Sequence, residues 1–370
     1  MKKVLIVIES LARGGAERLL VTTLTHLDRR RFDVTVVSLF GPNPLADEIR
    51  GLGIEVLEYG LAGPRDLIRA VFRLRRTIRE RHVDVVHTHL FSANVAGRVA
   101  ALGSAAVITT LHNPDYGQEG PPSGVGLRRL IDGATAHLCR PSYLAVSEDV
   151  KSDYLRHLSL SEVQVLHNYV DLASFQCDLD SVNRSQARGV LGVSDEDFLV
   201  LHVGRLHVQK GHDTLLRAFS WLVRDRPQCR LVLAGEGPLR NAIEASVRAL
   251  GLESQVQLLG GVADTASLYV AADVFVFPSR YEVFGMSLLE AMGAGLPSVV
   301  SGVGGILEVT SMESSVVVPP DDAEALCAGL RLLEGDSDRR RALAEFGRRR
   351  AMEFDVSVWL PELERLYAVA

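Results

Sequence analysis

The sequence has little cysteine, no long apolar run and no strong excess of either charge. Its four cysteines form no C-x-x-C pair, which argues against a disulfide framework and a zinc site and makes a reducing, cytoplasmic setting the expectation. No window approaches the ~20 apolar residues that a membrane-spanning helix needs, so any membrane contact is expected to be peripheral. The formal net charge of −6 gives no general reason to expect a nucleic-acid partner.

Two ligand-binding patterns are missing as well. Neither half has G-x-G-x-x-G with an acidic residue about 20 positions later, which argues against a dinucleotide-dependent dehydrogenase. No D-x-D triplet stands where it could bind a metal at a strand end, and Asp321 and Asp322 are expected to open a helix instead. We therefore expect neither a cofactor nor a metal site. The apolar start, residues 4–8, is short and lacks a small-residue cleavage site, so it is predicted to be a buried strand rather than a signal peptide.

Apolar strand-like runs alternate with helix-period segments along most of the 370 residues, a length that suits two domains. The expected strands of the first half are residues 4–8, 33–40, 54–59, 83–89, 106–112, 143–147 and 163–168, and those of the second half are 198–204, 230–235, 256–260, 273–278, 297–301 and 315–320. This βαβ rhythm predicts an α/β protein with two mostly parallel sheets covered by helices. A polar stretch at 178–197 is interpreted as a connector or an irregular entry to a second unit. Residues 354–370 are predicted to form a helix that Pro361 breaks near its start.

Paired glycines, Gly14 and Gly15, follow the first expected strand and precede a helix. They let a backbone approach a ligand closely, and the helix N-terminus behind them favours an anion. The spacing is equally compatible with an ordinary tight turn. In the second half, Arg205 and Lys210 lie in a loop between a strand and a helix, flanked by Gly204 and Gly211. Two cations at the carboxyl edge of a parallel sheet suit a diphosphate, whereas the alternative is a pair of solvated surface residues.

The stretch PSRYEVFGMSLLEAMGAGLP, residues 278–297, joins a buried strand to a helix expected to begin near Gly285. Open α/β sheets bind ligands at the carboxyl ends of their strands. Glu282 is predicted to lie in the loop and Glu290 about two turns into the helix, with the backbone N–H groups around Phe284, Gly285 and Met286 directed at the ligand. The alternative is a solvated pair of glutamates at a helix cap.

The order of these and further motifs resembles the large family of retaining nucleotide-sugar glycosyltransferases with two motif glutamates (family four). The motifs are GGAER, HTH, TTLH, VSE, HNYVD, VGRL with QKG, GEGP, LGGV, FPSRYEVFG and LLEAM, and they cover essentially the whole chain. The resemblance implies a GT-B fold with two Rossmann-like domains facing across a cleft. Residues 1–172 would bind mainly the acceptor and 173–353 mainly the nucleotide sugar, with the helix 354–370 packing back on the first domain.

The resemblance also implies roles for single residues. Arg205 and Lys210 would clamp the diphosphate, Glu282 would contact the transferred sugar, and His112 would lie beside that sugar and the acceptor. The implied catalytic set is Glu282, His112, Arg205 and Lys210, and the implied donor-binding set is Gly14, Gly15, Gly235, Glu236, Phe284, Gly285, Met286 and Glu290. Val283 stands where the family has a small residue and Tyr169 where glycine is common, so both depart from the pattern.

The activity implied is a metal-independent hexosyl transfer with retention of configuration. A UDP-sugar is favoured over a GDP-sugar as donor, and the acceptor is a glycan, a lipid-linked glycan or a small molecule of cell-surface polysaccharide or glycolipid synthesis. Two alternatives on the same fold are a nucleotide-sugar epimerase and a non-catalytic nucleotide-sugar-binding protein.

The segment 65–81 carries seven arginines, with apolar residues at helical spacing. One interpretation is a helix that rests on an anionic membrane, at the inner face of which the protein would be peripheral. The other is a helix that covers the sheet and keeps its arginines in solvent.

Overall fold

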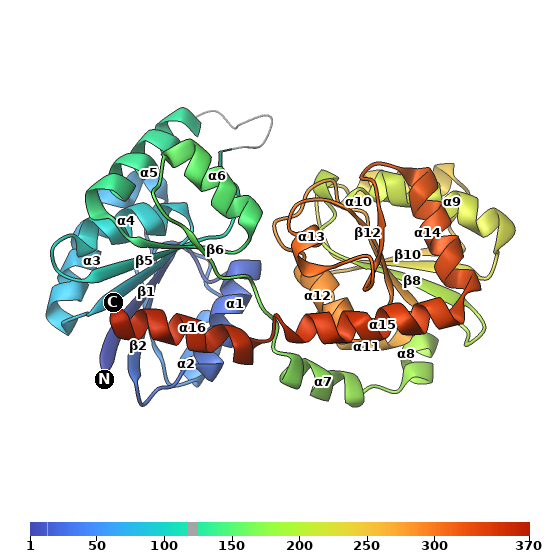
Figure 1. Cartoon of the computed structure of the whole chain (residues 1–370), viewed down its shortest axis with the longest axis horizontal. Helices are drawn as coiled ribbons and strands as arrows, with labels where there is room; N and C mark the ends of the chain where they lie inside the picture. The colour runs from blue at the N-terminus through green and yellow to red at the C-terminus, as the bar shows by residue number, and fades with distance from the viewer. Residues whose placement is uncertain (13, 117–124) are drawn as a thin grey trace. The chain divides into compact units, whose positions relative to one another are not determined.

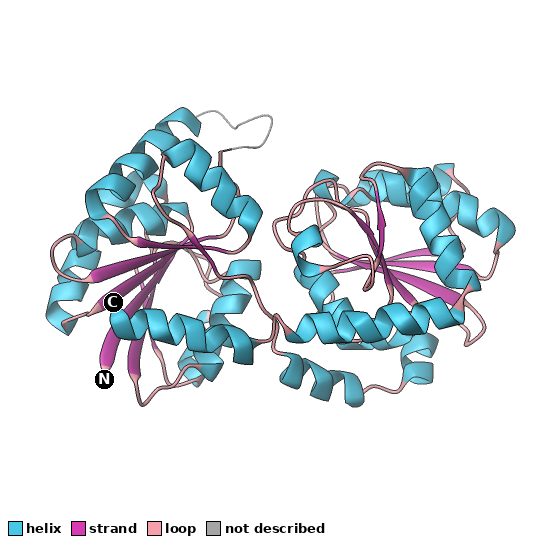
Figure 2. Ribbon diagram, in the orientation of Figure 1, coloured by secondary structure: helices cyan, strands magenta, loops and turns pink. Residues whose placement is uncertain are grey.

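The computed structural model describes residues 1–12, 14–116 and 125–370, which form two compact units (Figures 1 and 2). Unit 1 comprises Met1–Tyr169 and Val356–Ala370, and unit 2 comprises Val170–Asp355. The chain therefore leaves unit 1 after Tyr169 and returns to it at Val356.

Unit 1 is built on a parallel sheet with the strand order β3-β2-β1-β4-β5-β6-β7 in the described part of the chain. The strands are β1 (Lys2–Ile8), β2 (Phe32–Ser38), β3 (Glu55–Glu58), β4 (Val85–His89), β5 (Ala106–Leu111), β6 (Ser142–Ala145) and β7 (Gln164–Val165). The helices are α1 (Gly15–His26), α2 (Ala46–Gly51), the 3-10 turn η1 (Pro64–Asp66), α3 (Leu67–Arg81), α4 (Phe91–Ala101), α5 (Val125–Cys139), α6 (Glu148–Leu158) and α16 (Val356–Val369). Each strand of this sheet lies at a range that the alternation predicts.

Side chains of β1 alternate between the two faces of its sheet, as the period of two in a strand requires. Val4, Ile6 and Ile8 pack with α1, α2 and α16 on one face, and Leu5 and Val7 pack with α3 and α4 on the other. Figure 1 shows α16 beside α1, at the end of the chain drawn in red. Both faces of this sheet are therefore covered, which explains why its strands read as continuous apolar runs.

Unit 2 repeats the plan with a sheet in the order β10-β9-β8-β11-β12-β13 among the described residues. Its strands are β8 (Phe198–Val203), β9 (Cys229–Ala234), β10 (Val256–Gly260), β11 (Val274–Phe277), β12 (Ser298–Ser301) and β13 (Val316–Val318). Its helices are α7 (Leu172–Asp180), α8 (Arg184–Val190), η2 (Val208–Lys210), α9 (His212–Asp225), α10 (Arg240–Ala249), α11 (Ala266–Ala271), α12 (Met286–Gly293), α13 (Ile306–Val309), α14 (Ala323–Gly335) and α15 (Ser337–Met352). The prediction of two Rossmann-like parallel-sheet units is confirmed.

The central strands of unit 2 also have buried side chains on both faces of the sheet. Phe275 and Phe277 of β11 pack on one side, and Val274 and Val276 on the other, all fully buried. None of the described helices, in either unit, has the length and apolar character needed to cross a bilayer.

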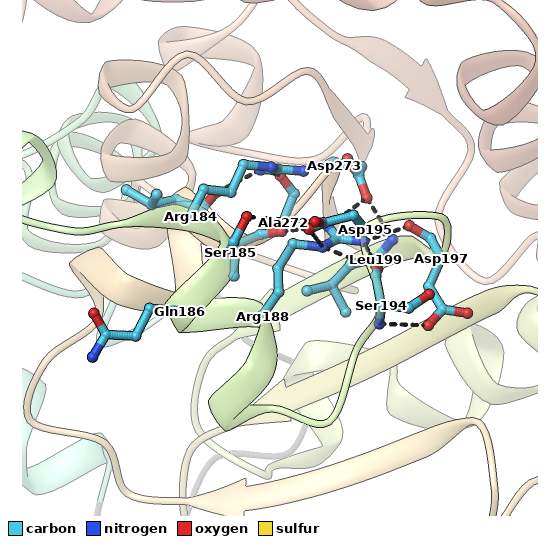
Figure 3. A network of polar contacts seen from close by, with 12 residues as sticks. Arg184, Ser185, Gln186, Arg188, Ser194, Asp195, Asp197, Leu199, Ala272 and Asp273 are labelled. Atoms are coloured by element: carbon cyan, nitrogen blue, oxygen red, sulfur yellow. Dashed lines mark hydrogen bonds and ion pairs between the residues drawn. The ribbon is translucent and has the colours of Figure 1, made fainter.

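Of the two interpretations of residues 178–197, the structure supports the entry to a second unit, because the stretch belongs to unit 2 and is partly helical rather than a plain connector. This stretch contains the end of α7 and all of α8, and Figure 3 shows the polar contacts that join Arg184 and Arg188 of α8 to their neighbours, while Ala187 of the same helix packs in the core. The guanidinium of Arg188, 1% exposed, donates to the carbonyls of Ser194, Asp197 and Ala271 and to the carboxylate of Asp273. Because polar contacts hold much of α8 in place, the stretch lacks the apolar periodicity that would have predicted a packed helix.

Asp273 connects this network to the two central strands of unit 2. One carboxylate oxygen accepts from the backbone N–H of Leu199 in β8 at 2.8 Å and from Arg188, and the other accepts from Arg184 at 2.6 Å. Asp273 directly precedes β11. The network therefore holds the amino ends of β8 and β11 together.

Pro361 does not break the C-terminal helix, contrary to the sequence-based prediction. It lies inside α16, which continues to Val369. Proline inside a helix costs about 3 kcal/mol, and tertiary contacts offset that cost here. Leu363 and Tyr367 are buried in the core of unit 1, and Glu364 accepts from the backbone N–H of Asp28 at 3.0 Å.

We expect Arg188→Ala to destabilise the protein by about 3 kcal/mol, because it removes a buried guanidinium and leaves the carbonyls of Ser194, Asp197 and Ala271 without that donor. Arg184→Ala is the matched control, since Arg184 bonds the same carboxylate but its side chain is 45% exposed, and its expected cost is below ~1 kcal/mol. Urea unfolding of both variants measures the difference. Equal losses would contradict the assignment of the buried arginine as the anchor.

Candidate functional site

The strand order of unit 2 reverses between β8 and β11, which are adjacent in the sheet although β9 and β10 lie between them in the sequence. In open α/β sheets such a switch point forms a crevice at the carboxyl ends of the two strands. Residues 204–211 follow β8 and residues 278–285 follow β11. Five of the predicted site residues therefore lie in the two loops at this switch point: Arg205, Lys210, Glu282, Phe284 and Gly285.

Lys210 and Glu282 are brought into direct contact. The ammonium of Lys210 donates to the carboxylate of Glu282, and both side chains are nearly buried, at 12% and 11% exposure. The ammonium also lies 4.5 Å from the centroid of the Phe277 ring. A cation and a carboxylate from the two switch-point loops thus form one nearly buried pair. If a ligand supplies both a phosphate oxygen and a hydroxyl group, the ammonium can bind the phosphate oxygen and the carboxylate can accept from the hydroxyl.

Arg205 differs from Lys210 because it is exposed and makes no ion pair with any residue that the structure describes. It lies in the same loop, directly after Gly204. Its planar guanidinium is thus available to an anion at the mouth of the site without breaking an existing contact.

Sequence reasoning missed Arg280, which holds the two loops together. Its guanidinium donates to both carboxylate oxygens of Asp213, at 2.8 and 2.7 Å, to Asp321 at 2.8 Å and to the carbonyl of Val208 at 2.8 Å. Its backbone N–H donates to the carbonyl of Gln209 at 2.8 Å. The only sequence signal was its place two residues before Glu282, since its partners are far away in the chain.

Glycines allow the loops after β8 and β9 to pack backbone against backbone. Gly235 has φ 145°, and a Cβ there would lie 1.9 Å from the carbonyl oxygen of Gly204. A Cβ on Gly237 would lie 2.3 Å from the carbonyl oxygen of Leu206. Glu236 lies between these two glycines. Its carboxylate accepts hydrogen bonds from the backbone N–H of Gly261, at 3.2 Å, and from the guanidinium of Arg240. This carboxylate, which the resemblance assigns to the donor-binding set, is therefore hydrogen-bonded to a neighbouring loop and to Arg240.

Helix α12 begins at Met286, one residue after the predicted start, with Gly285 as its cap at φ 92°. The Phe284 side chain is 1% exposed and packs edge-on against Phe354, so only its backbone can face a ligand. Glu290 lies in the second turn of α12, where it accepts from the hydroxyl of Tyr269 at 2.8 Å. Burial raises the pKa of Glu290, and the Tyr269 hydroxyl partly opposes that rise. Tyr269, which the sequence analysis did not select, is thus the present partner of this carboxylate.

In unit 1, Gly14 caps α1 and Gly15 is its first residue, while the neighbouring Arg13 lies outside the described residues. A Cβ on Gly15 would meet no described atom within 4 Å, whereas one on Gly14 would meet the carboxylate of Glu17 at 2.3 Å. Burial raises the pKa of Glu17. Neither glycine has a positive φ among the described residues. The nearby Glu17 carboxylate accounts for Gly14, whereas no described atom accounts for Gly15.

His112 follows β5 and forms a hydrogen bond with a second histidine. Its Nε2 lies 3.0 Å from Nδ1 of His89, at the end of β4. Burial lowers the pKa of His112 to about 4, and burial together with the neighbouring His87 and His112 lowers the pKa of His89. Both rings are therefore neutral at pH 7. The sequence analysis selected His112 alone, although the HTH motif contains the partner.

Tyr169, which departs from the family pattern, has a structural role in unit 1. Its hydroxyl donates to the carbonyl of Leu19 at 2.6 Å and also contacts the Thr23 hydroxyl, while its ring lies 4.2 Å from that of Trp359. Tyr169 therefore joins the last loop of unit 1 to α1 and to α16. Val283, the other departure from the family pattern, packs through its backbone against Gly305. A Cβ on Gly305 would lie 2.0 Å from the carbonyl oxygen of Val283.

Possible metal ligands do not gather in either unit: within the described ranges, no three side chains of His, Cys, Asp or Glu are placed to hold a metal ion. Asp322 caps α14, accepting from the backbone N–H of Ala325 at 2.9 Å. Asp321 accepts from Arg280 and Thr214. Both aspartates are thus used by the fold at the start of that helix, as expected.

Comparison with known proteins identifies the class of both units. Residues 183–350 match the family model of glycosyl transferases group 1, and residues 13–174 match that of glycosyltransferase family 4. With the two parallel-sheet units, these matches define a glycosyltransferase of the GT-B type. More specifically, the chain belongs to glycosyltransferase family 4, whose members include enzymes that use nucleotide sugars.

Similar proteins extend over most of the chain. An uncharacterized glycosyltransferase of Methanocaldococcus jannaschii, MJ1607, is 28% identical over 82% of this chain and 81% of its own length. An Escherichia coli UDP-Gal:alpha-D-GlcNAc-diphosphoundecaprenol alpha-1,3-galactosyltransferase is 25% identical over 79% of this chain and 77% of its own length. Among solved structures, Anabaena Alr3699/HepE in complex with UDP-glucose has a TM-score of 0.84 at 22% identity, with 100% of both chains covered. This last likeness shows the shared fold.

We expect Gly235→Ala to destabilise the protein by about 3 kcal/mol, because the new Cβ meets the Gly204 carbonyl and φ 145° is unfavourable for alanine. Gly189→Ala is the control: Gly189 is an exposed residue of α8 with no atom within 4 Å of an added Cβ, and alanine there is expected to stabilise the helix by about 0.5–1 kcal/mol. Thermal unfolding compares the two. A neutral effect at Gly235 would show that the loops after β8 and β9 can separate freely.

Proposed function

We propose that this glycosyltransferase transfers a hexose from a nucleoside-diphosphate sugar, UDP-sugar in the first place and GDP-sugar in the second, with retention of configuration and without a metal ion. The observation that supports it is the buried Lys210–Glu282 pair in the two loops at the switch point of unit 2. A nucleoside-diphosphate sugar offers phosphate oxygens and sugar hydroxyls to the two members of that pair. The Escherichia coli relative is named for UDP-Gal, and the Anabaena protein is in complex with UDP-glucose.

The chemistry assigned to these residues follows the charge that develops during transfer. Cleavage of the glycosidic bond places negative charge on the leaving diphosphate and positive charge on the sugar. Arg205, Lys210 and the N-terminus of α12 stabilise the diphosphate, since donors fixed in advance are usually the largest catalytic contribution. Glu282 orients the transferred sugar through its hydroxyls, and Glu290, freed from Tyr269, accepts from the ribose.

Unit 1 contributes the remaining proposed contacts. His112 is assigned to the transferred sugar or the acceptor, and the backbone of Gly14 and Gly15 to the donor phosphates. We propose that the acceptor is a glycan, a lipid-linked glycan or a small molecule of cell-surface polysaccharide or glycolipid synthesis. The four cysteines are free thiols, which supports a reducing, cytoplasmic setting.

A panel of UDP-, GDP- and ADP-sugars, scored first by thermal shift and then by transfer of labelled sugar to cell lipids and glycans, tests the proposal. UDP-sugars are expected to raise the unfolding temperature most, because a ligand that binds the native state stabilises it. Arg205→Ala and Glu282→Gln are expected to lower kcat/KM by at least ~100-fold with the fold intact. Arg217→Ala, which removes an exposed arginine of α9, is the matched control. Near-normal transfer by both site variants, or epimerised donor without transfer, would contradict the assignment.

A peripheral contact with anionic membrane through α3 is a further part of the proposal. Ala70, Leu74 and Ile78 bury one face of this helix against the sheet. Ile68 and Phe72, four residues apart on the opposite face, remain 72% and 70% exposed. Exposed arginines flank them: Arg65, Arg69, Arg73, Arg76 and Arg79. Large exposed apolar side chains flanked by cationic side chains are typical of helices that rest on anionic lipid.

Flotation with phosphatidylglycerol-containing vesicles tests this contact. We expect binding at low salt, weakening as salt screens the arginines, and loss of binding in an Ile68→Ser, Phe72→Ser variant. Phe346→Ser, which removes a 41% exposed phenylalanine from α15, serves as the control and should bind as the wild type does. Absence of wild-type binding to these vesicles at low salt removes the membrane contact from the proposal.

A further inference from the structure

A small cavity in unit 1 is closed by the C-terminal helix and contains two buried polar atoms that lack a described partner. The cavity measures about 30 Å³, which is room for roughly two water molecules. Its lining includes His89, His112 and Asn168 from unit 1's main segment and Trp359 from α16. Nε2 of His89 and Nε1 of Trp359 are buried without a hydrogen-bond partner among the described residues. Buried polar groups are almost always satisfied, by ordered water where protein groups do not reach.

His89 is the connection between this cavity and the proposed catalytic histidine. The residue is 8% exposed and lines the cavity. Its Nε2 is buried, and its Nδ1 is hydrogen-bonded to Nε2 of His112 at 3.0 Å. The neighbouring His87 does not compete for Nε2, because its own nitrogens contact the hydroxyls of Tyr367, at 2.6 Å, and Thr110, at 2.7 Å.

Hydrogen-bond roles follow from the chemistry of Trp359. Indole Nε1–H is a donor only, and a neutral imidazole has one donor and one acceptor nitrogen. A water that accepts from Trp359 still has both of its protons to donate, and one of them is assigned here to a bare Nε2 on His89. His89 then carries its proton on Nδ1 and donates to Nε2 of His112. The remaining proton of His112 must therefore be on Nδ1.

We infer that the C-terminal helix fixes the tautomer of His112, through Trp359, ordered water and His89, so that His112 presents an Nδ1–H donor. Trp359 and His89 are positioning residues in this arrangement, and His112 is the group that meets substrate. The catalytic part of the inference rests on the proposed function. An Nδ1–H on a ring that is neutral at pH 7 donates a hydrogen bond to a sugar hydroxyl or a phosphate oxygen and does not act as a base in that tautomer. This gives the last helix of the chain a role in the reaction as well as in the fold.

Nitrogen-15 NMR of protein labelled in its histidines reads the tautomer directly, with His112→Gln and His89→Gln identifying the resonances. The expected spectrum has a pyrrole-type Nδ1 and a pyridine-type Nε2 for both residues. A proton on Nε2 of His112 overturns the inference whatever the activity of the enzyme. Because this measurement needs no substrate, it stands or fails independently of the proposed function.

Trp359→Phe removes the N–H and keeps an aromatic ring beside Tyr169. We expect His112 in this variant to lose its single tautomer, and kcat to fall about tenfold with an unchanged KM for the donor, the size of effect that loss of one hydrogen bond produces. Trp221→Phe, at the other tryptophan of the sequence, is the matched control and should change neither. If the tautomer of His112 is unchanged in Trp359→Phe, or if it changes without an effect on kcat, the role assigned to Trp359 is wrong. His89→Phe provides a second variant, with the same expected loss.

Discussion

The parallel pairing of β8 with β11 is the constraint on which the candidate donor site depends. It places the loop that contains Lys210 beside the loop that contains Glu282, although 72 residues separate the two side chains. At the amino ends of the same strands, Asp273 and Arg188 fasten β8, β11 and α8 together. At the carboxyl ends, Arg280 joins the two loops through Asp213, Asp321 and backbone carbonyls. The site is thus rigid because both ends of one strand pair are held by arginines.

Much of this arrangement could be predicted from the sequence, because it depends on features that repeat along the chain. Strands covered on both faces are continuous apolar runs, and parallel strands bring their following loops to one edge. That reasoning predicts both sheets and places Lys210 and Glu282 at the same edge. The GT-B class, too, was available from the order of motifs, and the family matches confirm it.

The features that sequence reasoning missed depend on contacts between residues far apart in the chain. Arg188 has the appearance of a surface residue in a polar stretch, and only the fold shows that it is buried beside Asp273. Pro361 predicts a helix break, because the burial of Leu363 and Tyr367 that offsets its cost is not visible locally. His89 belongs to the candidate site because it is hydrogen-bonded to His112, and Tyr269 because it donates to Glu290. No periodicity reports such pairs.

The contact between Lys210 and Glu282 has a consequence for the end of the catalytic cycle. In the structure each of these nearly buried side chains neutralises the other. Under the proposed function, a nucleoside-diphosphate sugar would replace both halves of that contact, with a phosphate for the ammonium and hydroxyls for the carboxylate. The nucleoside diphosphate that remains after transfer would satisfy only the ammonium and would leave the carboxylate uncompensated. Re-formation of the pair would then compete with the bound nucleotide, so the two residues proposed to hold the donor would also favour release of the product.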